Sequence, residues 1–229
     1  MDEYKINKFF LLLEIESNNN NFEKVEQLKT FKINDLHFNK EPGYIINLIG
    51  VCYFYGILYS KNYSKALSFF ILGSKLNNSN SYNSIGVMYH KGIIFKKSYY
   101  KAIKYYEKAI QLNNHNAMYN IAIVYRNIFD YDNFIFYLYR AIDYHNPEAY
   151  LKLSHCYENG LCKLPVDKLK SFDLLLKAVK YKSNSAIRKL AKMYEDGIYI
   201  DRDLLSANEL YESINIKEEL IPTFFNFSI

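Results

Sequence analysis

The sequence contains few residues that interrupt or cross-link a polypeptide. Its 229 residues include four prolines, eight glycines and three cysteines, and there is no tryptophan. Scarce proline and glycine favour long helices joined by short turns, because these two residues are the strongest helix breakers. Half of the residues are apolar and 17% are aromatic, which is ample for a buried core. The length fits one elongated repeat domain or two small globular ones.

The N-terminal segment lacks a long apolar run. It contains only a short apolar stretch, Phe9 to Leu13, between acidic residues, which matches neither a signal peptide nor a membrane span. The odd number of cysteines argues against a disulfide framework. We therefore expect a soluble, intracellular protein in a reducing compartment, with no membrane association.

Motifs that carry catalytic or cofactor chemistry are missing as well. The sequence has no phosphate-binding glycine loop, no H-E-x-x-H, no paired C-x-x-C and no G-x-S-x-G. His155 and Cys156, with Cys162, come nearest to a metal cluster, but adjacent helical residues point about 100° apart and do not readily share one ion. We expect Cys156 to be buried and His155 exposed, and we predict no enzyme activity, no metal and no cofactor.

What the chain does contain is a repeat. A small residue followed three positions later by a tyrosine occurs five times, and the tyrosines are spaced by 36, 36, 32 and 37 residues. These tyrosines are Tyr53, Tyr89, Tyr125, Tyr157 and Tyr194. Four further small residues each precede the next copy by thirteen positions: Gly73, Ala109, Ala141 and Ala178. A period in the thirties that contains two helices is typical of a solenoid.

The copy at residues 81–109 predicts two amphipathic helices joined by a turn. Ile85, Gly86 and Tyr89 lie on one helical face, although a glycine inside a helix costs roughly 1 kcal/mol relative to alanine. We therefore expect Gly86 to lie where a second helix approaches closely. Gly92 is expected to end the first helix, because glycine tolerates the left-handed conformation found at helix C-termini.

The pattern [IL]-[GAS]-x-x-Tyr-x-x-Gly, followed by Lys-Ala-x-x-Tyr-Tyr-x-Lys-Ala, resembles the Sel-one-like repeat family, a relative of the tetratricopeptide repeats. Residues 81–114 match this pattern most fully, and the likeness covers residues 43–214. Repeat three departs from it, since it lacks the turn glycine and has Phe134 in place of an alanine. The resemblance implies a non-catalytic scaffold or adaptor that binds protein partners.

We predict an all-α, right-handed α-solenoid of five to six antiparallel helix pairs. Residues 1–42 form a degenerate helix pair that caps the stack or, alternatively, a separate small module. Residues 43–214 form five repeats, and residues 215–229 form a C-terminal cap or tail that folds back or docks elsewhere. The predicted helix pairs are 43–56 with 62–76, 79–91 with 98–112, 115–127 with 131–144, 147–159 with 167–181, and 184–196 with 203–214.

In solenoids of this kind the first helix of each pair lines the concave surface. The free face of each first helix lies three positions before, one after and four after its small residue, and we predict a partner-binding groove there. Its residues are Asn47, Val51, Phe54, Asn83, Val87, His90, Tyr119, Ile123, Arg126, His155, Glu158, Arg188, Lys192 and Glu195. The groove changes from apolar to charged along the chain, which suits an amphipathic or extended peptide bound to a monomer.

A stripe of lysines gives a second hypothesis for function. Lys97, Lys101, Lys104 and Lys108 follow one helical face beside tyrosines, and such a face can contact phosphates while bases stack alongside. The net charge of +5 is weak support for nucleic-acid binding, and a solvated face explains the stripe equally simply. The leading hypothesis is that the protein binds a protein or peptide partner, and the alternative is that it binds RNA. A third hypothesis, hydrolase activity, would need a nucleophile with a neighbouring base, and the sequence offers no such pair.

Overall fold

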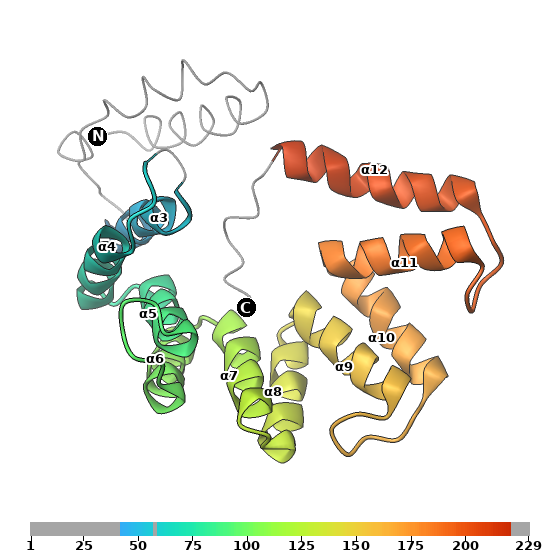
Figure 1. Cartoon of the computed structure of the whole chain (residues 1–229), viewed down its shortest axis with the longest axis horizontal. Coiled ribbons are helices and arrows are strands. Elements are labelled where there is room, and N and C mark those ends of the chain that lie inside the picture. Colours follow the sequence, from blue (N-terminus) through green and yellow to red (C-terminus); the bar gives the residue numbers. More distant parts are fainter. Residues whose placement is uncertain (1–41, 57–58, 221–229) are drawn as a thin grey trace. The chain divides into compact units, whose positions relative to one another are not determined.

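The computed structural model describes residues 42–56 and 59–220, and all regular elements in this part of the chain are α-helices. The helices, α3 to α12, follow one another in pairs joined by short turns (Figure 1). Residues 42–114 belong to one compact unit, here called the first, and His115–Lys217 belong to the second. The all-α class predicted from the sequence is confirmed.

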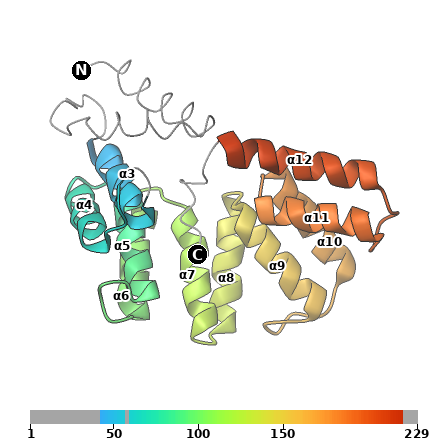
Figure 2. The ribbon, with the colours of Figure 1, turned by 45° about the horizontal axis from the view of Figure 1, so that its top comes forward.

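Among the described helices, two pairs belong to the first unit and three to the second. Figure 2 shows these helices from another side. The pairs of the first unit are α3 (Pro42–Tyr55) with α4 (Tyr63–Lys75), and α5 (Ser79–Lys91) with α6 (Tyr99–Gln111). Those of the second are α7 (Asn116–Asn127) with α8 (Tyr131–Asp143), α9 (Pro147–Asn159) with α10 (Lys168–Lys180), and α11 (Asn184–Asp196) with α12 (Leu204–Leu220). The predicted bounds differ by one residue at most, except that α12 continues beyond residue 214 to Leu220.

Side-chain caps explain where the helices begin. The side chain of Asn78 accepts a hydrogen bond from the N–H of Ser81 at the start of α5. Asn146 accepts one from the N–H of Ala149 in the same way, directly before Pro147 opens α9. Such caps satisfy N–H groups that have no partner inside the helix, and proline at the first position lacks one of those groups anyway.

The first helices end in a left-handed residue. Gly92 has φ 73°, and its N–H donates to the carbonyl of Met88, while Gly160 and Gly197 end α9 and α11 with the same geometry. The predicted role of these glycines is confirmed. Repeat three has no glycine here, and Phe129 takes the left-handed conformation at φ 63° instead. The missing glycine therefore leaves the helix pair intact.

The small residue of each first helix faces the second helix of its pair. A Cβ atom on Gly86 would lie 2.6 Å from the ring of Tyr106, and one on Gly50 would lie 2.6 Å from the ring of Phe70. Both rings are fully buried. The predicted close approach at Gly86 is confirmed, and the approaching group is an aromatic ring of the second helix.

In the second unit, different residues fill the space between the two helices of a pair. Where the first unit has glycine opposite an aromatic ring, α7 and α9 carry Ala122 and Ser154, and the equivalent positions in α8 and α10 are Leu138 and Leu175. All four side chains are buried. The hydroxyl of Ser154 also donates to the backbone carbonyl of Ser171 at 2.8 Å, which joins α9 to α10 inside the core.

Hydrogen bonds between polar side chains link successive first helices. Within the second unit, the amide of Asn146 donates to the side-chain oxygen of Asn116 at 3.0 Å, and the hydroxyl of Ser183 donates to Glu148 at 2.7 Å. In the first unit, the amide of Asn114 donates to the side-chain oxygen of Asn80 at 2.8 Å. In the second unit, a residue at the start of one first helix reaches the residue two positions after the equivalent point one repeat earlier. Within that unit, these links fix the register of neighbouring repeats.

Some predictions fall on parts of the chain outside the described residues. The predicted cap at residues 1–42 lies outside them apart from Pro42, and so do residues 221–229 of the predicted tail. The right-handed superhelix also stays a prediction.

Candidate partner-binding surface

The structure divides the predicted groove residues into a buried set and a surface set. The buried set exposes no more than 5% of each residue: Asn47, Val51, Phe54, Asn83, Val87, His90, Tyr119 and Ile123. The surface set consists of Arg126, His155, Glu158, Arg188, Lys192 and Glu195, which lie on α7, α9 and α11. Buried side chains contact the rest of the protein rather than a partner, so a binding surface can use only the surface set.

The residues of the buried set contact neighbouring helices. The ring of Phe54 packs edge-on against Tyr63 at 5.2 Å between centroids and lies 6.3 Å from Phe70, which places it in the core of the first helix pair. The amide of Asn47 donates to the hydroxyl of Ser84 in the next first helix at 3.1 Å. These side chains therefore hold neighbouring helices together.

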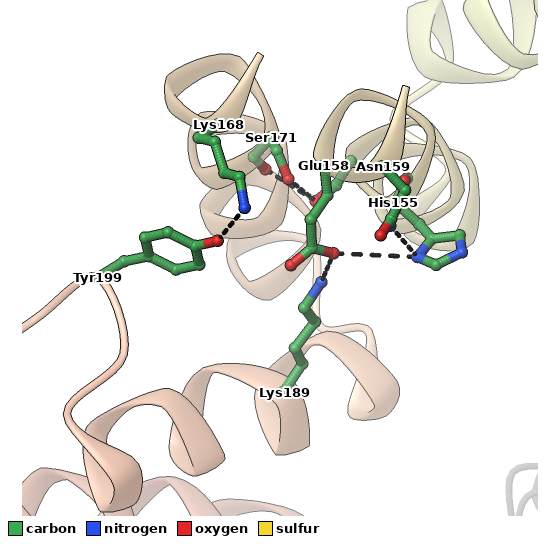
Figure 3. Close-up of polar contacts among 8 residues, drawn as sticks. His155, Glu158, Asn159, Lys168, Ser171, Lys189 and Tyr199 are labelled. Atoms are coloured by element: carbon green, nitrogen blue, oxygen red, sulfur yellow. Dashed lines mark hydrogen bonds and ion pairs between the residues drawn. The ribbon is translucent and has the colours of Figure 1, made fainter. Parts of the chain in front are cut away.

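An ion pair connects α9 to α11 within the surface set. The amine of Lys189 lies 2.5 Å from a carboxylate oxygen of Glu158, and both side chains are partly buried (Figure 3). Nδ1 of His155 lies 3.9 Å from the same carboxylate and 3.1 Å from the amide nitrogen of Asn159. Glu158 thus links two first helices and orients the histidine beside it.

Lys192 is paired within its own helix. Its amine lies 3.3 Å from Glu195 and 3.1 Å from Asp196, and these carboxylates raise the pKa of Lys192 through hydrogen bonding. The side chain is more than half exposed, so its charge stays accessible to a partner. The acidic residues at the end of α11, which are unfavourable for the helix dipole, are offset by this lysine.

Two residues of like charge influence each other at the junction of α7 and α9. Burial lowers the pKa of Lys152 below that of an ordinary lysine, and the charge of Arg126 lowers it further. Glu148 and Cys156, one turn away on either side of Lys152, oppose this shift weakly. The predicted residue Arg126 therefore has a neighbour, Lys152, that the positional rule for the groove did not include.

The lysine stripe predicted as a solvated face or a phosphate-binding face lies against aromatic rings. The amine of Lys101 lies 5.3 Å from the centre of the Tyr89 ring, and Lys108 lies 5.6 Å from that of Tyr82. Lys97 and Lys104 approach tyrosine rings in the same way. Cation–π contacts of this kind are worth about 0.5–1 kcal/mol at exposed sites. These lysines therefore contribute to the packing of the repeat.

The equivalent lysine of repeat four makes a stronger contact. Lys170 donates to the hydroxyl of Tyr157 at 2.7 Å, and that hydroxyl lies 3.0 Å from the hydroxyl of Tyr139. Burial raises the pKa of Tyr157, but the hydrogen bonds from Lys170 and Tyr139 outweigh it, so the pKa is lowered. In repeats one, two and four, the tyrosine that marks the repeat thus contacts a lysine in the first turn of the following helix.

The cysteines and histidines near the end of α9 lie as predicted. Cys156 is buried and His155 is exposed. Burial raises the pKa of the Cys156 thiol to about 12, with a further contribution from hydrogen bonding to Cys162. Cys52, Cys156 and Cys162 are all free thiols. Across residues 42–56 and 59–220, the histidine, cysteine and acidic side chains form no group of three that could hold a metal ion.

The repeat geometry and its residues match a known family. Residues 46–78, 79–114, 147–180 and 184–213, more than half of the chain, match the family model for the Sel1 repeat. The chain belongs to the Sel1 repeat family. Sel1 repeat proteins are generally scaffolds for protein interactions. The matched segments leave out residues 115–146, where the structure nevertheless places the helix pair α7 and α8.

Solved structures of Sel1 repeat proteins share this fold. A crystal structure of a Sel1 repeat protein from Oxalobacter formigenes has a TM-score of 0.63 and 20% identity, over 89% of this chain and 84% of that chain. The c5321 protective antigen of uropathogenic Escherichia coli, which displays an SLR fold, has a TM-score of 0.53 and 16% identity, over 90% of this chain and 45% of that chain. No curated protein sequence matches this chain. Among the described Sel1 helices, none is long and apolar enough to cross a membrane.

Proposed function

We propose that this protein is a non-catalytic adaptor whose protein or peptide partner binds a charged face of the second unit. This α9–α11 face consists of His155 and Glu158 on α9 and Arg188, Lys192 and Glu195 on α11, with Arg126 of α7 beside it. The observation that carries the proposal is a difference in burial between equivalent positions. In α3 and α5 they are buried, whereas in α9 and α11 all of them except Leu151 carry charged or imidazole side chains at the surface.

The chemistry of the α9–α11 face suggests the kind of partner it binds. The face carries both cationic and anionic groups, and several are already held in place by ion pairs such as Glu158 with Lys189. Charge complementarity of this kind contributes to specificity and association rate more than to total affinity. A partner with charges of both signs at matching spacing would fit this pattern, and the general role of Sel1 repeat proteins as scaffolds supports it.

The test is a pull-down from the source cell, using intact protein and two charge-reversed variants. Lys192→Glu changes the α9–α11 face, and Lys177→Glu is the matched control on the second helix α10. Both lysines are about half exposed and pair with an acid four residues away, so both substitutions remove a similar ion pair. We expect a partner captured by the parent and by Lys177→Glu to bind Lys192→Glu about tenfold more weakly by calorimetry.

Two results would overturn the proposal. Equal affinity of the parent and Lys192→Glu would show that the face is not used, and an equal loss in both variants would indicate a general charge effect. Circular dichroism checks that both variants remain folded. The pull-down is repeated after ribonuclease treatment, and capture that disappears would favour the RNA hypothesis over a protein partner.

A further inference from the structure

Two junctions between first helices in the second unit use equivalent repeat positions but different charges. At the α9–α11 junction, Glu158 lies four residues after the small residue of its helix and pairs with Lys189, which lies two residues before the next small residue. At the α7–α9 junction these two positions are occupied by Arg126 and Lys152, both half-buried. The repeat positions that bring an acid and a base together at one junction therefore hold two bases at the other.

The surroundings of Arg126 and Lys152 supply no direct counter-ion. Within the described residues, neither side chain makes an ion pair or a side-chain hydrogen bond. The nearest acid on α9, Glu148, lies one turn before Lys152 and accepts a hydrogen bond from Ser183 at 2.7 Å. The remaining titratable neighbour of Lys152 is the buried thiol of Cys156.

This arrangement is electrostatically unfavourable in the protein by itself. Lys152 is partly removed from water, and desolvation makes the repulsion from a nearby cation stronger than it would be at the surface. An anion placed between the two side chains would remove the repulsion and form two charge-assisted contacts. Arginine presents a planar fork that matches a carboxylate, and the lysine adds a compact positive charge.

We propose that Arg126 and Lys152 form a carboxylate-binding site, and that the carboxylate belongs to an acidic residue of the protein or peptide partner. The junction at Glu158 and Lys189 supports the choice of ligand, because there a carboxylate is held by a lysine at the equivalent position. The neighbouring α9–α11 face supports a peptide source. The inference rests on the proposed function and names one chemical feature of the partner.

The first test measures binding of a labelled hexaglutamate peptide, blocked at both ends, by fluorescence anisotropy at fixed ionic strength. We expect Arg126→Gln and Lys152→Gln each to weaken binding about tenfold, and Lys177→Gln on α10 to leave it unchanged. Unchanged binding in the first two variants, an equal loss at Lys177→Gln, or equal binding of hexaglutamine would each overturn the proposal. Inorganic phosphate that binds more tightly than hexaglutamate would show that the site takes a free anion and would overturn the assignment to a peptide.

A second variant separates loss of binding from loss of fold. Arg126→Glu recreates at the α7–α9 junction the acid and lysine pair seen at the next one, so the melting temperature should rise by about 2–4 °C while hexaglutamate binding is lost. A lower melting temperature would contradict the paired geometry. The peptide assay needs no cellular partner, so its failure leaves the Lys192→Glu result standing, and failure at Lys192 leaves the carboxylate site standing.

Discussion

The two units of the chain use different residues to fill the space between their paired helices. In the first unit, a glycine of one helix receives an aromatic ring of the next, as Gly86 receives Tyr106. In the second unit, the equivalent places hold alanine or serine opposite leucine, as in Ser154 and Leu175. Added volume on one helix is matched by removed volume on the other. The repeat therefore specifies the filled space between two helices rather than a residue at either position.

The units also differ in what their first helices present to solvent. Residues such as Asn83 and Val87 are buried, whereas Arg188 and Lys192 at the equivalent positions in α11 are exposed. The same backbone unit thus serves as core in one region and as polar surface in another. Charge at these positions is the reason why we propose that a partner binds the second unit.

The largest effect is expected from overfilling the first unit. Gly86→Leu should lower the free energy of unfolding by roughly 1–3 kcal/mol, because even a Cβ atom would lie 2.6 Å from the buried ring of Tyr106. Chemical denaturation monitored by circular dichroism measures the change, with Glu107→Leu at an exposed position of α6 as control. A variant as stable as the parent would contradict the close contact.

A double variant can give the first unit the alanine and leucine packing of the second unit. Gly86→Ala and Tyr106→Leu should each destabilise, by crowding and by leaving a cavity, while the double variant reproduces the alanine and leucine found at Ala122 and Leu138. We expect the double variant to be more stable than the sum of the two single effects. Simple additivity would show that the two positions do not share a space.

A smaller loss of stability is expected when a buried side chain is removed from the second unit. Ser154→Gly should cost about 1–2 kcal/mol, since it removes the hydrogen bond to the carbonyl of Ser171 and places a glycine within α9. Gly86→Ser, the reverse exchange in the first unit, should also destabilise, but through collision with Tyr106. Thermal and chemical denaturation of both variants test this, and a gain in stability for either would contradict the assigned packing.

The smallest change in stability is expected from removing the hydroxyl of Tyr106. The hydroxyl of Tyr106 is buried and has no hydrogen-bond partner among the described residues, and burial raises the pKa of Tyr106 well above its usual range. Tyr106→Phe should therefore stabilise the protein by about 1 kcal/mol. It copies Phe70 of the first repeat, so Phe70→Tyr should destabilise by a similar amount. Differential scanning calorimetry measures both shifts, and a loss of stability in Tyr106→Phe would reveal a partner for the hydroxyl.

Local signals made the helices predictable from the sequence. Caps such as Asn146 and turn residues such as Gly92 act within a few positions of themselves, and the repeated small residues mark the helix contacts. The surface was harder to predict. A fixed offset placed Phe54 and Lys192 in one groove, but burial depends on which residues the neighbouring helices supply, and Phe54 faces other aromatic rings.

Contacts between repeats were missed for a similar reason. The approach of Lys152 to Arg126 involves residues 26 positions apart, and neither belongs to the repeat pattern. The link from Asn114 to Asn80 did leave a signal, because polar residues recur near the starts of the first helices. The extension of α12 to Leu220 lies beyond the last copy of the pattern, where no repeat spacing applies.

The polar link between successive first helices has a consequence for how such a chain can grow. Asn146 donates backward to Asn116, while Glu148, two positions later, accepts from Ser183. The donor and the acceptor therefore lie within one three-residue segment of the same repeat. A gene duplication that copies one repeat copies both the donor and the acceptor residue. The new repeat can therefore form hydrogen bonds to both of its neighbours.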